Sequence, residues 1–152
     1  MTIYADTSFI VASRVRHDVF HRVALTWFER HENETWLWSP WHRVEVLNTI
    51  RQLTRDRDDS KPLSVMEAKA IIRRLEADVR RDYLVHMEAD WRDVLRAASE
   101  ISVGNAFDRG CSATDLLHVA YALELASDLF VTFDKEQWKL AGSTGLNAES
   151  PS

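Results

Sequence analysis

Apolar residues alternate along the chain between short runs and helix-spaced stripes. The short runs predict strands at residues 3–5, 36–38, 83–87 and 129–133. Between them, apolar residues recur three and four positions apart, which predicts amphipathic helices at residues 9–12, 18–32, 40–55, 64–80, 90–101, 116–126 and 135–141. Strands that alternate with helices predict a three-layer α/β/α domain with a central, mostly parallel sheet of about four to five strands.

Capping residues mark where several of these helices begin. Ser39 precedes Pro40, and Ser64 and Ser112 are each followed three residues later by an acid. The helix at 116–126 is apolar almost all round, so we expect it to be buried against the sheet. In the other helices we expect the apolar stripes to face the core, at positions that include Trp27, Val44, Leu53, Val65, Trp91, Leu95 and Trp138.

Breaks in the pattern set the boundaries of the domain. Residues 56–62 form a charged stretch ending in proline, and residues 104–110 carry turn signals around two glycines. The stretch after residue 142 is small and polar. We therefore expect one domain over residues 1–146, followed by a flexible tail at 147–152.

Composition narrows the class of protein. The 152 residues include one cysteine, which excludes an intramolecular disulfide and favours a reducing compartment. No apolar run approaches the ~20 residues of a membrane span, and no signal sequence is evident, so we expect a cytoplasmic protein without membrane contact. The net charge of −5 disfavours a nucleic-acid partner. However, most of the cations are arginines, which bind phosphate well, and a bound cation would offset clustered carboxylates.

Four acids from separate segments point to one place. Asp6 and Asp134 end predicted strands, and Asp115 opens the helix that leads to the second of these strands. Glu45 lies in the second turn of the helix that follows the strand at 36–38. Because parallel strands end at the same edge of a sheet, these carboxylates could meet in one cleft. Asp6 alone is equally well explained as a helix N-cap.

Carboxylates gathered in one cleft repel one another, and a bound cation relieves that repulsion. Oxygen ligands suit Mg²⁺ or Mn²⁺, and a single cysteine cannot build a thiolate site. Cations held by carboxylates serve phosphoryl chemistry, because they activate water and neutralise the charge that develops on the phosphate.

The chain resembles the PIN-domain ribonucleases, and most closely the VapC-type toxins of bacterial toxin–antitoxin pairs. The resemblance runs from residue 3 to about residue 146 and rests on four ordered stretches, 4–8, 39–48, 113–122 and 131–135. It implies a PIN-like fold and Mg²⁺- or Mn²⁺-dependent cleavage of RNA, with tRNA as one candidate substrate. Asp6, Glu45 and Asp115 take the positions of the family's metal-binding acids, and Asp134 matches a more variable fourth acid. Thr7, Ser8 and Thr132 fall where hydroxyls orient carboxylates or water.

The resemblance also implies partners. These are the RNA substrate, an antitoxin encoded beside the toxin, and a second copy of the chain in a homodimer. The long apolar stripes at 41–55 and 64–80 offer a groove for such a partner helix. Two other functions are considered, a catalytically silent binding or regulatory module on the same fold and a phosphatase with Asp6 as nucleophile. The phosphatase is disfavoured because Ser8 stands where such sites carry a second aspartate.

Other reactive side chains have simpler explanations. His17 and His21 have the spacing of metal ligands on a helix, but a solvated helix face is favoured. His118 lies one turn after Asp115 and could join the site, although helix packing is the favoured role. Cys111 has no identifiable partners for nucleophilic catalysis. Trp38 or Trp41 could stack on a base, and Arg43 could contact a phosphate.

Overall fold

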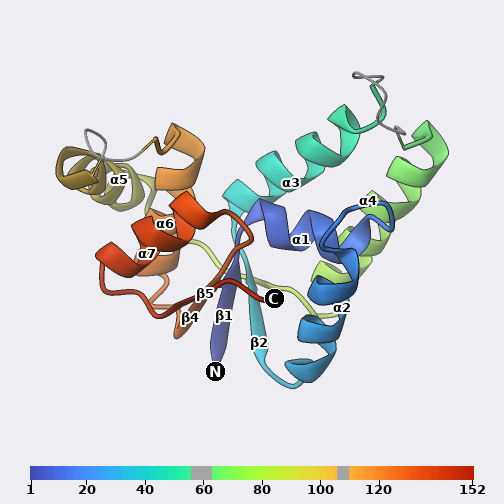
Figure 1. Ribbon diagram of the computed structural model, residues 1–152, viewed down its shortest axis with the longest axis horizontal. Helices are drawn as coiled ribbons and strands as arrows, with labels where there is room; N and C mark the ends of the chain where they lie inside the picture. The colour runs from blue at the N-terminus through green and yellow to red at the C-terminus, as the bar shows by residue number, and fades with distance from the viewer. Residues whose placement is uncertain (56–62, 106–109) are drawn as a thin grey trace.

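One parallel sheet lies at the centre of the molecule (Figure 1). The computed structural model describes residues 1–55, 63–105 and 110–152. Within them, five strands pair in the order β3-β2-β1-β4-β5, and every neighbouring pair is parallel. The strands are β1 (Thr2–Ala5), β2 (Thr35–Trp38), β3 (Val85–His86), β4 (Leu129–Val131) and β5 (Ala148–Glu149). The predicted α/β fold is confirmed.

Helices cover both faces of this sheet. One layer contains α1 (Thr7–Arg14), α2 (His21–Arg30), α3 (Pro40–Gln52) and α4 (Val65–Arg80). The opposite layer contains α5 (Trp91–Asn105), α6 (Ala113–Glu124) and α7 (Lys135–Ser143). The sequence patterns at 56–62 and 106–109 lie outside the described residues.

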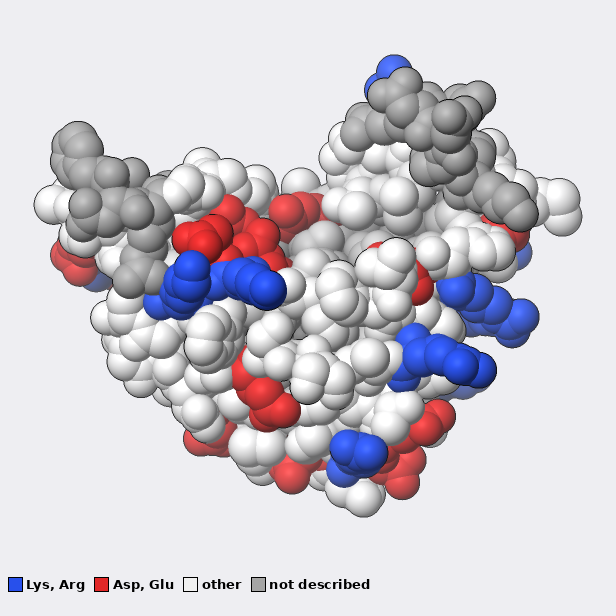
Figure 2. Space-filling model, viewed as in Figure 1, with Lys and Arg blue, Asp and Glu red and all other residues white. Residues whose placement is uncertain are grey.

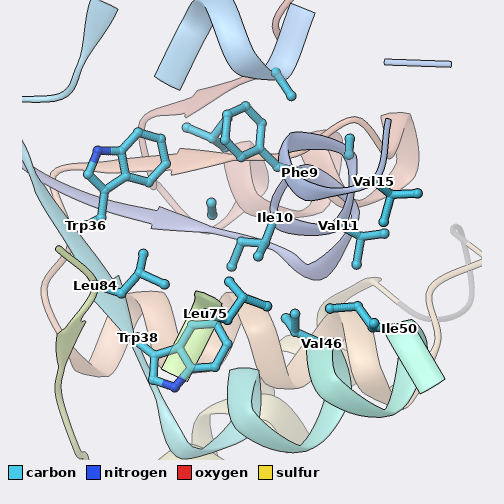
Figure 3. Packing of buried hydrophobic residues seen from close by; sticks show 14 of the residues in the cluster. Phe9, Ile10, Val11, Val15, Trp36, Trp38, Val46, Ile50, Leu75 and Leu84 are labelled. Carbon is cyan, nitrogen blue, oxygen red and sulfur yellow. The ribbon is translucent and has the colours of Figure 1, made fainter. Parts of the chain in front are cut away.

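The alternation of side chains along the strands divides the core in two. Ile3 and Ala5 of β1 pack with the α1–α4 layer, whereas Tyr4 between them packs with the α5–α7 layer. Neighbouring β2 alternates in the same way, and Figure 3 shows side chains of α1, α3 and α4 converging on Trp36 and Trp38. The near-continuous apolar strands are thus explained, because both faces of the sheet are buried.

Several apolar positions that we expected to face the core are exposed instead. In α3 the buried apolar side chains are Val46, Leu47 and Ile50, so Val44, two residues before Val46, points away and is 59% exposed. Other apolar side chains that we expected to face the core are also exposed: Leu53, Val65, Trp91, Leu95 and Trp138. Of the three tryptophans expected in the core, only Trp27 is buried. The apolar stripe on each of these helices therefore includes more residues than the helix buries in the core.

The C-terminal stretch carries structure that its composition does not indicate. Ala148 and Glu149 pair with Phe130 and Val131 of β4, and Pro151 is buried. These residues lie in the stretch for which we expected a flexible tail. Glu149 also accepts a hydrogen bond from the indole nitrogen of Trp27, at 2.8 Å. None of the helices in the described ranges has the length and apolar character needed to span a bilayer.

Candidate metal-binding and catalytic site

Asp6 stands where β1 ends and α1 begins. Its backbone N–H donates to the carbonyl of Val131 at 2.9 Å, which extends the pairing of β1 with β4 by one residue. Its carboxylate accepts from the backbone N–H of Phe9 at 3.0 Å and so caps α1. The capping role and a place at the candidate site are therefore compatible.

Two hydroxyls hold the carboxylate of Asp6, one from Ser8 in the first turn of α1 and one from Thr132 just after β4. Ser8 Oγ donates to it at 2.7 Å from Oδ1 and 2.9 Å from Oδ2. Thr132 Oγ1 donates to Oδ2 at 2.9 Å. Phe133 N–H donates in turn to Ser8 Oγ at 3.1 Å, so the segment after β4 orients the serine. Ser8 and Thr132 are two of the three hydroxyls for which the resemblance to the PIN-domain ribonucleases implies an orienting role.

Burial shapes the electrostatics of Asp6. The side chain is 4% exposed, and burial raises its pKa above the ordinary value, although nearby His118 and the hydrogen bonds from Phe9, Ser8 and Thr132 act in the opposite direction. The ionised form is thus held at a cost in free energy. A cation bound beside it would lower that cost.

Glu45 projects from the second turn of α3 and meets His118 of α6. Thr7 Oγ1 donates to Glu45 Oε2 at 2.7 Å, and His118 Nε2 hydrogen-bonds to the same oxygen. Partial burial by itself would raise the pKa of Glu45, but the hydrogen bond and charge of His118, together with the hydrogen bond of Thr7, lower it below the ordinary value. Helix packing is the role that we favoured for His118, but packing alone does not account for its hydrogen bond to Glu45.

A buried polar network continues behind His118. Its Nδ1 lies 3.0 Å from the hydroxyl of Tyr4, which lies 3.3 Å from Ser39 Oγ. His42 Nδ1 accepts from the backbone N–H of Ser39 at 2.9 Å, so its Nε2–H donates to the carbonyl of Ala5 at 2.7 Å. Burial lowers the pKa of His42 to about 3, so this imidazole is neutral near pH 7. The network joins α6 and α3 to the last residue of β1.

Asp115 and Asp134 cap helices at the same edge of the sheet. Asp115 Oδ2 accepts from the N–H and the hydroxyl of Ser112, each at 2.8 Å. Asp134 Oδ1 accepts from the N–H groups of Glu136 and Gln137, at 2.8 and 2.9 Å. Among the described residues, the second oxygen of each carboxylate accepts no hydrogen bond. Both acids thus keep an oxygen for another ligand.

One residue that sequence reasoning missed lies between these acids. Gln137 is buried, its Oε1 lies 3.2 Å from Thr132 Oγ1, and its Nε2 donates to the backbone carbonyl of Asp115 at 3.5 Å. Its spacing of three residues from Asp134 places it on the first turn of α7. The spacing of three residues after the capping Asp134 is the sequence signal that could have identified Gln137, but glutamine is common at that position of a helix.

Acidic side chains gather on one face of the molecule. Figure 2 shows red atoms around a hollow between α3 on one side and α6 and α7 on the other. In the described ranges, however, no three Asp, Glu, His or Cys side chains are grouped closely enough to hold a metal ion. The fold thus brings the four predicted acids to one edge of the sheet, where Glu45 is hydrogen-bonded to His118 and to Thr7, the residue after Asp6, while Asp115 and Asp134 remain on their caps.

Other predicted candidates lie outside the site. Arg43 pairs with Glu76 at 3.0 Å rather than remaining free for a phosphate. Trp38 is buried, which leaves Trp41 as the tryptophan of that pair with exposed surface. His17 lies in the turn between α1 and α2, so it does not share a helix face with His21.

The donor set suits a hard divalent cation. Asp6, Glu45, Asp115 and Asp134 supply carboxylate oxygens only, and they come from four separate segments at one edge of the sheet. The buried charge of Asp6, whose pKa burial raises, is a further feature that a cation would complement. The chemistry of these donors, rather than their spacing in this structure, therefore fits Mg²⁺ or Mn²⁺.

Fold and site together define an α/β protein that carries carboxylates at the C-terminal edge of a parallel sheet. The model of the PIN domain family matches residues 3–143, and the chain belongs to this family. The resemblance to PIN-domain proteins that the sequence indicated is thereby confirmed. Members of the family are generally nucleases.

Solved structures share the fold at low sequence identity. FitAcB from Neisseria gonorrhoeae has a TM-score of 0.69 and 16% identity, with 97% of this chain and 96% of that chain covered. VapBC2 from Rickettsia felis, bound to a DNA fragment from their promoter, has a TM-score of 0.69 and 15% identity over 100% of both chains. VapBC-1 from nontypeable Haemophilus influenzae has a TM-score of 0.64 and 14% identity, with 99% and 98% covered. No curated protein sequence matches the chain.

Proposed function

We propose that the chain is a Mg²⁺- or Mn²⁺-dependent endoribonuclease and the toxin of a toxin–antitoxin pair. The observation that carries this proposal is the arrangement at the carboxyl end of β1. There Asp6 is buried and held by Phe9, Ser8 and Thr132, and Thr7 next to it donates to Glu45 of α3, which also hydrogen-bonds to His118 of α6. Membership of the PIN domain family supports nuclease chemistry.

Each acid has a proposed role. Asp6 and Asp115 would hold the cation most directly, Glu45 would complete its ligands, and Asp134 would support a second cation or orient the attacking water. A cation bound there supplies activated water and neutralises charge on the phosphoryl oxygens. Ser8 and Thr132 keep Asp6 oriented, so little reorganisation is needed as the reaction proceeds. In-line hydrolysis would leave a 5′-phosphate and a 3′-hydroxyl.

The proposed partners follow from the solved relatives and from the exposed surface. The similar structures are FitAB and VapBC complexes, two of them with bound DNA, which supports an antitoxin partner for this chain. Val44 of α3 and Val65 of α4 are exposed apolar side chains that a partner helix or a second copy could cover. We propose a cytoplasmic RNA as substrate, with tRNA as one candidate.

The first test is cleavage of RNA by wild type and by Asp6→Asn, with Mg²⁺ or Mn²⁺ present. Asparagine is as good an N-cap as aspartate, so the variant should fold, while the loss of a charged ligand should lower kcat about 100-fold or more. Glu124→Gln, an exposed acid on α6, is the matched control and should cleave like wild type. Equal rates for wild type and Asp6→Asn would overturn the proposal.

Calorimetric titration with Mn²⁺ separates the nuclease from a catalytically silent module. The nuclease should bind Mn²⁺ in wild type and more weakly in Asp6→Asn. A silent module should show no binding that depends on this carboxylate.

A further inference from the structure

The imidazole of His118 joins three segments that carry site residues. It lies on α6, one turn after Asp115, and its side chain is 2% exposed. Nε2 hydrogen-bonds to Glu45 Oε2 on α3 and lies 3.0 Å from Thr7 Oγ1 at the start of α1. A histidine placed only to fill the core would not need polar partners on two other helices.

We propose that His118 is a positioning residue that decides which oxygen of Glu45 a cation can bind. The inference rests on the proposed function. Glu45 Oε2 accepts from both Thr7 Oγ1 and His118 Nε2, and two hydrogen bonds occupy both lone pairs of that oxygen. Among the described residues, Oε1 accepts no hydrogen bond, and the side chain of Glu45 is 24% exposed. Glu45 therefore serves as a one-oxygen ligand through Oε1.

The ring of His118 is itself held in place. Tyr4 is buried at the centre of the sheet, its ring stacks on Phe130 with centroids 5.8 Å apart, and its hydroxyl lies 3.0 Å from His118 Nδ1. When Nε2–H donates to Glu45, neutral Nδ1 accepts from the tyrosine O–H. Both the neutral and the charged imidazole present Nε2–H to Glu45, so the geometry does not depend on the protonation of His118.

A pair of variants separates positioning from packing. His118→Leu keeps an apolar side chain of similar bulk but has no donor, whereas His118→Gln retains an N–H donor about as far along the side chain as Nε2. We expect His118→Leu to weaken Mn²⁺ binding about 10- to 100-fold and to lower kcat for RNA cleavage by a similar factor, with KM for RNA unchanged. His118→Gln should restore Mn²⁺ affinity to within about threefold of wild type.

Tyr4→Phe tests the anchor even if a substitution at His118 prevents folding. It removes one hydroxyl, keeps the stacked ring, and should weaken Mn²⁺ binding by less than His118→Leu does. Thermal unfolding of each variant shows whether the fold survives. The proposal is overturned if folded His118→Leu or Tyr4→Phe binds Mn²⁺ as wild type does, or if His118→Gln is as defective as His118→Leu.

A measurement on the metal-free protein keeps this inference distinct from the proposed function. The ¹⁵N spectrum of the imidazoles should show the Nε2 signal of His118 shifting in Glu45→Ala, and not in the control Glu124→Ala. A wild-type protein that neither binds Mn²⁺ nor cleaves RNA would contradict the nuclease, whatever this spectrum shows. An Nε2 signal that is the same in wild type and Glu45→Ala would remove the hydrogen bond on which the positioning role depends.

Discussion

His42 is a buried imidazole whose ionisation opposes folding. Burial and the nearby charge of His118 lower its pKa from 6.5 to about 3, despite its hydrogen bond to the Ala5 carbonyl. Between these two pH values the unfolded chain binds a proton that the folded chain does not, so stability falls as the pH falls from 6.5 towards 3. The loss amounts to about 1.4 kcal/mol for each pH unit.

The His42→Gln variant should remove this pH dependence. At pH 7 we expect it to be less stable than wild type by about 1–3 kcal/mol, because buried hydrogen bonds are lost. Between pH 6 and 4, the free energy of unfolding of the variant should fall less steeply than that of wild type, by about 1.4 kcal/mol per pH unit. Urea unfolding across this pH range measures both effects.

His17→Gln provides the comparison for His42→Gln, because His17 is exposed in the turn before α2. Its stability should follow the wild-type pH profile. Asp6 and Glu45 titrate in all three proteins and so cancel from the comparison. Parallel profiles for wild type and His42→Gln would show that His42 is already protonated in the folded state.

The sequence predicted the individual residues of the candidate site unevenly. Asp6 could be singled out because it stands where a predicted strand ends, and that position is encoded locally, whereas the roles of Ser8 and Thr132 were implied by the resemblance to the PIN-domain ribonucleases. The contact of His118 with Glu45 joins residues 73 positions apart, and no local pattern encodes it. From the sequence alone, helix packing is the favoured role for a histidine on a buried helix, because its contact with Glu45 depends on how α6 packs against α3.

At the scale of elements, the end of α6 is strained. Ala126 has a φ of 49°, a left-handed conformation that costs free energy for a residue with a Cβ atom. Replacing it with glycine should raise the free energy of unfolding by about 0.5–1 kcal/mol. Thermal or urea unfolding of Ala126→Gly tests this.

Ala77→Gly inside α4 is the matched control, because the same substitution in a helix interior should destabilise by about 1 kcal/mol. If both substitutions changed the free energy of unfolding in the same direction, the assignment of strain to Ala126 would be contradicted.

How well a strand could be predicted depended on how clearly its residues form an apolar run. The strands β1, β2 and β4 are buried apolar runs, and a run of that kind is a strong signal. By contrast, β5 consists of Ala148 and Glu149, neither of which favours strands, and it exists because β4 offers a free edge. Tertiary pairing, rather than intrinsic preference, forms it.

Across the whole molecule, stability depends on the two layers that bury the sheet. Leu75 of α4 is 0% exposed in the layer against Trp36 and Trp38, whereas Leu95 of α5 is 52% exposed. We expect Leu75→Ala to lower the free energy of unfolding by about 2–5 kcal/mol, and Leu95→Ala to change it by less than about 0.5 kcal/mol. Chemical denaturation of both variants checks the difference, and a large loss in Leu95→Ala would contradict the exposed position of that residue.

The order of the strands also has a consequence for the timing of folding. The central strand β1 is synthesised well before its neighbour β4, and the hydrogen bond between Asp6 and Thr132 closes a separation of 126 residues. Contacts between such distant residues form slowly, because a long loop must close before they can. A growing chain therefore carries Asp6 long before it can assemble the surroundings of that carboxylate, because the hydroxyl of Thr132 is synthesised 126 residues later.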